Sequence, residues 1–398
     1  MMHTEFSDPR TATSDALSLN AARAAFFLGG FGLSSWAPLV PFAQSRLHLA
    51  SGELGLFLLC IGIGSLISMP LAGPLTSRVG CRLVLCVADL IFCLTLPLLS
   101  VCTGRIALAI TLLLFGGAIG ANGVAMNVQA SLVERACARP VMSGILALFS
   151  VGGIAGSGGM TWLLSHHVAP LQACLAADAV IALILLVFVR RFLSHGGEDG
   201  PAFALPHGSI IRLGCVACMI YLVEGMMLDW SGIILTSLAH VPIARAGAGY
   251  TTFACFMVAG RLFGDALVKR FGQSAILRGG LLLTAGGLSI VVAVRFPLTA
   301  FAGLALVGAG ASNVVPILFR AAGSSQAMPS NLAIAAVATL GYVGVLTGPA
   351  LIGFLASAAG LTTAVLIVAL ATASTTTLIP NVRDDMHRFS PSLDRSTP

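Results

Sequence analysis

The chain has 398 residues, of which 57% are hydrophobic and only 9% are charged. A soluble domain carries roughly 25% charged residues, so this composition excludes a protein whose main solvent is water. The formal net charge is +6, but the basic residues gather in the loops on one side of the predicted membrane spans, so the excess indicates no nucleic-acid partner.

Twelve apolar stretches follow a polar N-terminal tail, residues 1–18. A transmembrane helix needs about 20 apolar residues, and these stretches cover residues 19–43, 53–77, 82–102, 105–130, 141–165, 169–190, 210–237, 247–269, 276–296, 299–321, 331–357 and 361–380. A polar linker, 191–209, separates a bundle over 19–190 from a bundle over 210–380, and a polar tail, 381–398, follows. The sequence therefore predicts an all-α membrane protein with twelve transmembrane helices in two six-helix bundles.

The distribution of Arg and Lys predicts how these spans are oriented. If both termini and the linker are cytoplasmic, sixteen basic residues lie on the cytoplasmic side, and four lie on the other side: Arg46, Arg105, Arg245 and Arg295. Cytoplasmic loops carry the excess of Lys and Arg, so we expect both termini inside. The polar tail lacks a basic segment followed by a short apolar core and a cleavage site, so we expect no removable signal peptide.

The ten cysteines and eight histidines do not indicate a metal or redox site. Cys215-x-x-Cys218 is the only close pair of cysteines, and no second pair or histidine lies nearby in the sequence to complete a zinc site. Cysteine otherwise packs as a small hydrophobe. We therefore expect no metal and no cofactor.

Two motifs recur at an offset of 192 residues. Gly73-x-Leu75-x-x-Arg78-x-Gly80 returns as Asp265-x-Leu267-x-x-Arg270-x-Gly272, and Gly152-x-x-x-Gly156 returns as Gly344-x-x-x-Gly348. A repeat of this length between apolar segments indicates a duplicated bundle, so we expect the two bundles to be pseudo-symmetric. Small residues let helix backbones approach closely, and we expect the glycines of spans five and eleven to lie where the halves slide.

The loop between spans two and three carries a family resemblance. Gly73-Pro74-Leu75-Thr76-Ser77-Arg78-Val79-Gly80-Cys81-Arg82 resembles the signature of the major facilitator superfamily, commonly written G-x-L-a-D-R-x-G-r-R. Further segments resemble bacterial inner-membrane permeases of poorly defined substrate, distantly related to sugar permeases: 224–231, 260–265, 313–316 and 341–349. The resemblance implies the major facilitator fold, in which spans one, four, seven and ten line a central cavity.

This chain departs from the family pattern in its N-terminal half. Ser77 stands where the signature usually has an aspartate, so the resemblance leaves the N-half without the usual gating ion pair. The fourth span has neutral residues around Gly123, where relatives often carry an acid. We therefore expect little proton chemistry in the N-half.

Ionisable groups inside spans are costly and thus indicate function. Glu224 lies 14 residues into a span that begins near Ile210, or about 21 Å at 1.5 Å per residue, which is near mid-membrane. We expect Glu224 and Asp229 to couple transport to protons. The alternatives are a structural hydrogen bond for Glu224 and an outer gate for Asp229, paired with Arg46 or Arg245.

Other buried charges divide into gating and structural candidates. Arg261 and Asp265 lie four residues apart on span eight and can pair along one face, as an inner gate or as a static pair. The loop motif and its echo extend the gating set to Gly73, Arg78, Gly80, Arg82, Arg270 and Gly272. Asp89 and Asp178 lie in spans three and six, which the resemblance places outside the cavity, and we expect them to lock helices together.

Uncharged polar and aromatic residues of the predicted spans are candidate solute contacts: Trp36, Asn122, Asn127, Gln129, Tyr221, Trp230 and Asn313. The amides can equally hydrogen-bond between helices, and the tryptophans can anchor the membrane interface.

The leading interpretation is a proton-coupled secondary transporter of a small organic solute, monomeric, in the bacterial inner membrane. No P-loop motif occurs in the sequence, so we do not expect ATP hydrolysis. A proton-driven efflux antiporter is an alternative, although Ser157 replaces the proline of the antiporter motif that span five resembles. A non-transporting sensor and a membrane enzyme are further alternatives, and His166-His167 is the only hint of an enzyme.

Overall fold

The computed structural model describes residues 9–137, 141–196, 208–293, 296–325 and 329–379, and every regular element in these ranges is a helix. The N-half contains α1 Pro9–Ser35, η1 Ala37–Leu39, α2 Val40–Arg46, α3 Ser51–Val101, α4 Arg105–Cys137, α5 Met142–Ser165, α6 Pro170–Phe188 and η2 Val189–Arg191. The C-half contains α7 Ser209–Leu238, η3 Ile243–Arg245, α8 Ala248–Phe271, α9 Gln273–Ala293, α10 Pro297–Ala311, α11 Val314–Gly323, α12 Ser330–Ala359, α13 Leu361–Ser374 and η4 Thr375–Leu378.

These elements confirm twelve spans within the described residues. Eleven helical stretches are long and apolar enough to cross a membrane, and one of them, α3, has 51 residues with a non-helical break at Gly80. Because about 20 residues suffice for one crossing, α3 contains spans two and three. Elements α10 and α11 together make span ten, α12 is span eleven and α13 is span twelve.

The first helix starts inside the predicted tail. We expected residues 1–18 to be a tail, and α1 begins at Pro9, whereas the stretch suited to cross a membrane begins at Leu17, close to the predicted residue 19. Most of the predicted linker, residues 197–207, and the tail 381–398 lie outside the described residues, so their assignment stays a prediction.

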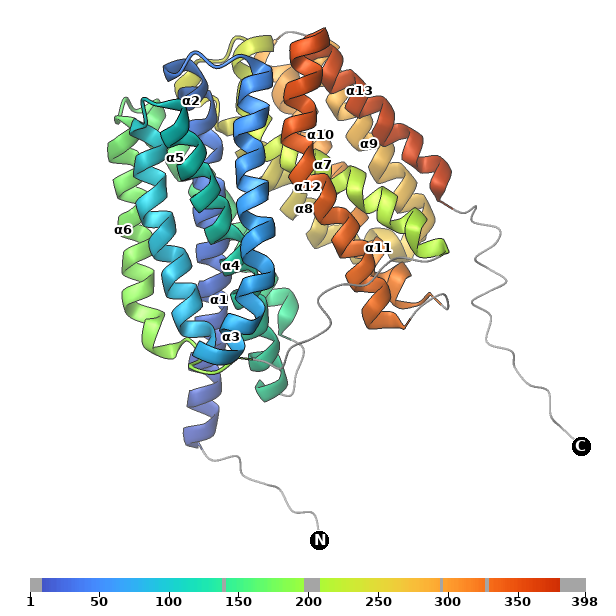
Figure 1. Cartoon of the computed structure of the whole chain (residues 1–398). Coiled ribbons are helices and arrows are strands. Elements are labelled where there is room, and N and C mark those ends of the chain that lie inside the picture. Colours follow the sequence, from blue (N-terminus) through green and yellow to red (C-terminus); the bar gives the residue numbers. More distant parts are fainter. Residues whose placement is uncertain (1–8, 138–140, 197–207, 294–295, 326–328, 380–398) are drawn as a thin grey trace, which may run out of the picture.

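The two halves lie side by side, with the N-half drawn in blue to green and the C-half in yellow-green to red (Figure 1). We call the end that holds α2 and the α12–α13 junction the upper end, and the end that holds α11 and the start of α1 the lower end. Within each half the packing repeats, since α1 packs on α5 just as α7 packs on α12.

The echoed glycines explain this repeated packing. A Cβ on Gly152 would collide with the backbone carbonyl of Phe27 in α1, and a Cβ on Gly344 would collide with that of Cys218 in α7. Our expectation that these glycines lie between the halves is therefore wrong: they let two helices of the same half approach closely.

The second echo is a matched break in the backbone. Gly80 has φ 83° and ψ 159°, and Gly272, 192 positions later, has φ 82° and ψ 159°. This region is accessible essentially only to glycine. It lets the chain turn sharply at the lower end between spans two and three, and again between spans eight and nine.

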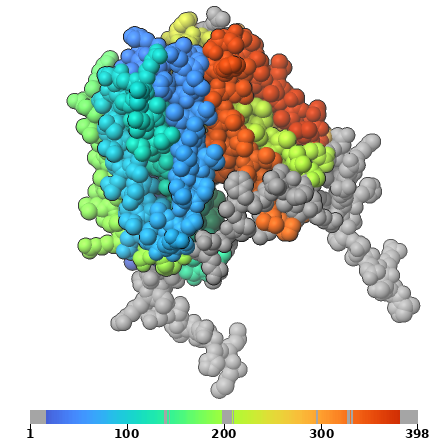
Figure 2. All heavy atoms as spheres, in the orientation of Figure 1, coloured from blue at the N-terminus to red at the C-terminus, as the bar shows by residue number. Residues whose placement is uncertain are grey.

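A different set of small residues lies at the seam between the halves, where α3 packs on α12. An added Cβ on Gly55 would lie 2.8 Å from the Cα of Gly353, and one on Gly52 would lie 3.0 Å from the hydroxyl of Ser357. Figure 2 shows the blue spheres of α3 against the orange spheres of α12 along this seam. The halves therefore approach at backbone distance near the upper end.

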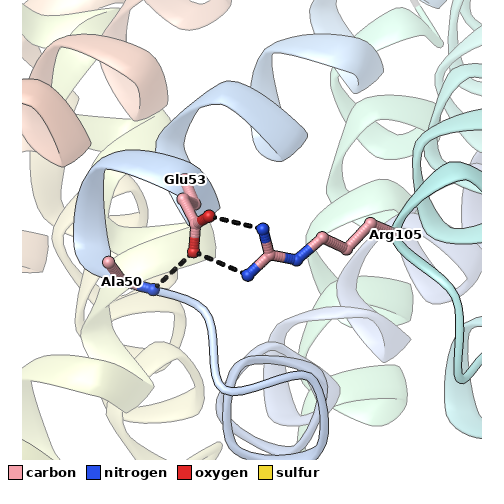
Figure 3. A network of polar contacts seen from close by, with 3 residues as sticks. All are labelled: Ala50, Glu53 and Arg105. Carbon is pink, nitrogen blue, oxygen red and sulfur yellow. Dashed lines mark hydrogen bonds and ion pairs between the residues drawn. The ribbon is translucent and has the colours of Figure 1, made fainter.

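An ion pair fixes the upper end of the N-half (Figure 3). Arg105, at the start of α4, contacts Glu53 of α3 at 2.7 Å, and Glu53 also accepts a hydrogen bond from the backbone N–H of Ala50 at 3.1 Å. Glu53 thereby caps α3 as in a capping box and joins the starts of spans two and four.

The two matched glycines can be tested by substitution. Gly80→Ala and Gly272→Ala should each destabilise the protein by about 1–3 kcal/mol, because alanine does not tolerate this backbone conformation. Gly80→Ala should cost more, because its Cβ would collide with the carbonyl group of Ser194, whereas nothing lies within 4 Å of a Cβ on Gly272. Thermal unfolding of the purified variants in detergent measures the difference. Equal losses would contradict the role of the Ser194 contact.

Candidate functional site

A cavity of about 360 Å³ lies between the two halves. Helices α1, α3, α4 and α5 of the N-half and α7, α8 and α12 of the C-half line it. Its volume lies in the range typical of small-molecule sites, roughly 300–1,000 Å³. The wall of the cavity is mostly apolar, with few polar groups.

The charged groups of the cavity wall all come from the C-half. Glu224 and Asp229 reach it from α7, and Arg261 reaches it from α8. Glu224 Oε1 and Asp229 Oδ1 are buried without a hydrogen-bond partner in the described structure. Unsatisfied buried acceptors are costly, so both atoms are available to a proton or to a donor on a bound solute.

All three tyrosines of the chain line the same cavity: Tyr221 of α7, Tyr250 of α8 and Tyr342 of α12. The rings of Tyr221 and Tyr342 are nearly parallel, with centroids 6.3 Å apart. The Tyr221 ring lies against Gly341, where a Cβ would collide with it. Tyr250 and Tyr342 were missed as candidates, although the rarity of tyrosine in the sequence was an available signal.

Asp229 is not paired with either arginine that we proposed. Arg46 instead donates to the carbonyl oxygens of Leu99, Ser100 and Cys102 at the C-terminal end of α3, where basic side chains commonly cap helices. Asp229 lies beside the indole of Trp36. Trp36 Nε1 and Asp229 Oδ1 both lack a hydrogen-bond partner by distance and angle, so a small approach of the α1–η1 junction to α7 would satisfy both.

The expected Arg261–Asp265 pair is also wrong. Asp265 pairs at 3.4 Å with Arg320 of α11. The Nε of Arg261 donates at 3.4 Å to the carbonyl oxygen of Ser312, at the break between α10 and α11. Pro316, four residues later, has no N–H to donate to that carbonyl, so Arg261 satisfies an acceptor that the helix leaves unpaired.

Three of the seven predicted solute contacts line the cavity, namely Trp36, Asn122 and Tyr221. The other four do not. Asn127 is exposed and bonds to its own helix, Gln129 accepts from the backbone of Leu193, and Trp230 is fully buried. Asn313 donates at 2.9 Å to the carbonyl oxygen of Gly260, which ties span ten to span eight.

Asn122 connects the cavity to a buried acid of the N-half. Its Nδ2 donates at 2.8 Å to Oδ1 of Asp89 on α3, and Asp89 is fully buried. This contact agrees with our expectation that Asp89 locks two helices together, and it places the acid directly behind a cavity residue.

The loop motif between spans two and three anchors the end of span six. Arg82 donates to the carbonyl oxygens of Arg190 and Phe192, and Gly80 packs on Ser194. Gly73 and Arg78 are at least partly exposed on the lower part of α3. In the echo, the guanidinium of Arg270 lies over the ring of Phe271, and Gly272 makes the matched break.

No group of three potential metal ligands occurs among the described residues.

Contacts between the halves close the cavity toward the upper end. Ser34 of α1 donates to the hydroxyl of Tyr250 at 3.3 Å, and Thr251 of α8 donates to Ser157 of α5 at 3.1 Å. Above them, a Cβ on Gly247 would collide with Pro38 and Thr161. Toward the lower end, Arg261 is exposed and Tyr342 is 50% exposed. The cavity therefore opens toward the lower end.

Sequence comparison now places the chain in a family. The model of the Major Facilitator Superfamily matches residues 24–216. An uncharacterized MFS-type transporter of Yersinia pestis is 47% identical over 352 residues, which cover 88% of this chain and 92% of that protein. The chain belongs to the Major Facilitator Superfamily.

Other comparisons agree with this assignment. An uncharacterized transporter of Sinorhizobium fredii is 33% identical and covers 90% of this chain and 96% of its own length. The crystal structure of the nucleoside transporter NupG superposes with a TM-score of 0.71 at 13% identity, covering 95% of this chain and all of that chain. At that identity the likeness shows the fold alone. The relatives are bacterial membrane transporters, and this facilitator protein is a multi-span membrane transporter rather than an enzyme.

The closure at the upper end can be tested with two adjacent threonines. Thr251→Val removes the contact with Ser157, whereas Thr252→Val, the matched control, removes only a bond to Ala248 in its own helix. One hydrogen bond contributes about 1 kcal/mol, so Thr251→Val should raise the population open at the upper end about fivefold. Distances between spin labels at the upper ends of α5 and α8 would report it. An equal effect of both substitutions would contradict the assignment.

Proposed function

We propose that this protein is a proton-coupled secondary transporter of a small organic solute, with both termini on the cytoplasmic side of a bacterial inner membrane. The observation that carries the proposal is the cavity between the halves, which is closed at the upper end and carries two carboxyls with unpartnered oxygens. Transporters built from two repeats bind solute at such an interface and rock the halves about it.

The orientation follows from the basic residues. Arg78, Arg82, Arg135, Lys269 and Arg270 lie at lower ends of helices, and Arg46, Arg105 and Arg245 lie at upper ends. Under the positive-inside rule the lower end is cytoplasmic. The cavity then faces the cytoplasm, and loading from outside requires the upper contacts to break.

Glu224 is the group we assign to proton coupling, with Asp229 as its partner on the same helix. Both line the cavity, and five residues on an α-helix turn by about 140°, so the two carboxyls reach different parts of the wall. Glu224 lies within the electrostatic influence of Arg261. A proton on Glu224 and a solute bound near Arg261 therefore affect each other directly.

The gating groups in this proposal are those at the lower end. The Asp265–Arg320 pair joins α8 to α11, and the motif residues Gly73, Arg78, Gly80 and Arg82 and their counterparts Arg270 and Gly272 hold the turns about which the helices move. Both charges of the ion pair are exposed, so the pair can break at little cost when α8 and α11 move relative to each other within the C-half.

A second candidate function is proton-driven efflux of apolar solutes. Met69, Met126 and Met257 line the cavity together with Phe92, Phe149 and Phe253. Flexible methionine-rich walls are typical of sites that accept many ligands. The two functions differ in the direction in which an imposed proton gradient moves the solute.

Proteoliposomes with an imposed pH gradient test the proposal. Binding to the folded state raises the unfolding temperature, so a thermal-shift screen of metabolites first selects the solutes. Glu224→Gln should abolish accumulation driven by the gradient but preserve exchange of solute across the membrane, because exchange moves no net proton. Full gradient-driven accumulation by this variant would exclude Glu224 as the coupling group.

The matched control is Glu53→Gln. Glu53 lies in a partly exposed ion pair outside the cavity, which contributes roughly 0.2–1 kcal/mol, so coupled transport should survive. If the wild type moves no solute of a broad panel in either direction, with insertion verified, the transport function itself is excluded for that panel's chemistry.

A further inference from the structure

The Asp89–Asn122 contact holds two unpaired atoms that complement each other. Asn122 Nδ2 donates to Asp89 Oδ1, while Asp89 Oδ2 and Asn122 Oδ1 are buried with no hydrogen-bond partner in the described structure. If Asp89 is ionised, both of these atoms are acceptors and neither can satisfy the other. If Asp89 carries a proton on Oδ2, that O–H can donate to Asn122 Oδ1.

A protonated aspartic acid and an amide therefore fit this contact better than a carboxylate and an amide. The acid–amide pair forms a ring of two hydrogen bonds and leaves no buried polar atom unpaired. The carboxylate would leave two acceptors unpaired and a buried charge without a counter-ion. The ion pairs of the described residues, Arg105–Glu53 and Arg320–Asp265, lie elsewhere.

Among the described residues, no positive charge acts on Asp89 itself. The titratable side chains that influence the same region are Cys86 and Cys93 on α3 and Asp178 on α6. Arg82 acts on Cys86 but donates to the carbonyl oxygens of Arg190 and Phe192. Helices α1 and α4 bring Gly29 and Asn122 to this point, and neither is charged. A proton on Asp89 is thus the remaining way to neutralise the buried carboxyl.

Asn122 links this acid to the solute cavity. It lines the cavity, as do Gly29 on one side and Phe92, three residues after Asp89, on the other. A Cβ on Gly29 would lie 2.8 Å from Asn122 Oδ1, so the amide is held between α1, α3 and α4. The amide can engage Asp89 fully, or it can shift toward the cavity and offer Oδ1, which is buried in this structure, to a donor there.

We propose that Asp89 is a second proton-binding site of this transporter, in the N-half, and that its proton controls whether Asn122 binds solute. With the proton on Asp89 Oδ2, the ring is closed and Asn122 Oδ1 is occupied. When the proton passes to water in the cavity, Asp89 becomes a carboxylate that keeps the bond from Asn122 Nδ2, and Asn122 Oδ1 becomes free to accept from a hydroxyl or amine of the solute. This inference rests on the proposed transport function.

Infrared spectroscopy of the protein in liposomes tests the proton without any solute. At neutral pH the wild type should show the C=O absorption of a protonated carboxyl that Asp89→Asn removes. Asn122→Ala should move this absorption to higher frequency, because the carbonyl loses a donor. Asp178→Asn, a second carboxyl of the N-half that does not contact Asn122, is the matched control and should leave this absorption in place. If Asp89→Asn removes only a carboxylate absorption, the inference is overturned.

Transport assays test the link to the solute. In Asp89→Asn the new amide donates permanently to Asn122, so solute exchange at alkaline pH should need about fivefold more solute, equivalent to about 1 kcal/mol. At acid pH the variant should match the wild type. A pH-independent defect, or none, would overturn the link.

The exchanged pair Asp89→Asn with Asn122→Asp keeps one acid and one amide in contact. It should restore the infrared absorption and the folded yield if Asp89→Asn alone folds poorly. If the protein shows the Asp89 absorption but moves no solute, the transport proposal fails and the protonated Asp89 stands. If the protein transports solute without that absorption, the transport proposal stands and this inference fails.

Discussion

The close packing of the two halves at the upper end is the constraint on which the cavity depends. Gly52 and Gly55 of α3 meet Ser357 and Gly353 of α12 near backbone contact, so the halves cannot approach further there. Hydroxyl contacts from α1 and α5 to α8 complete the closure. Hydrogen bonds between hydroxyls involve no charged group and each contributes little. The upper end is therefore held mainly by close packing, and it can open without separating an ion pair in a low-dielectric medium.

In the C-half, two side chains satisfy backbone carbonyl oxygens around the break in span ten. Arg261 satisfies the Ser312 carbonyl that Pro316 cannot pair, and Asn313 of the same break donates to the carbonyl oxygen of Gly260. An irregular backbone is tolerated at membrane depth only where protein or a cavity satisfies it. The break in span ten therefore orients Arg261, which lines the cavity together with Glu224 and Asp229. The Arg261 side chain thus satisfies a carbonyl oxygen at the helix break and also gives the cavity wall a positive charge.

The sequence predicted the parts of this structure that depend on composition and repetition. Twelve spans and the division into halves follow from hydropathy and the 192-residue offset. The offset also marked Gly80 and Gly272, as gating residues, but it did not predict the matched backbone break that they form. Which side chains face the cavity could not be predicted, because this depends on how each helix is rotated about its axis against its neighbours. Asn127 and Gln129 lie on the same helix as Asn122, yet only Asn122 faces the cavity. The predicted ion-pair partners of Arg46 and Asp265 were wrong for a related reason. Arg46 caps α3, and Asp265 pairs with Arg320 on another helix.

The duplicated halves keep their packing while their chemistry differs. The repeat preserves the glycines at which α5 meets α1 and α12 meets α7, because a side chain there would separate the helices. Residues that line the cavity are not under that restriction, and in the C-half two acids and an arginine lie in the cavity wall. In the N-half, Asp89 of α3 lies behind the cavity wall and contacts the neutral amide of Asn122, which lines the cavity. A solute in the cavity therefore meets charge on one side only, and Asp89 can respond to that solute through the amide of Asn122 rather than through a direct ionic contact.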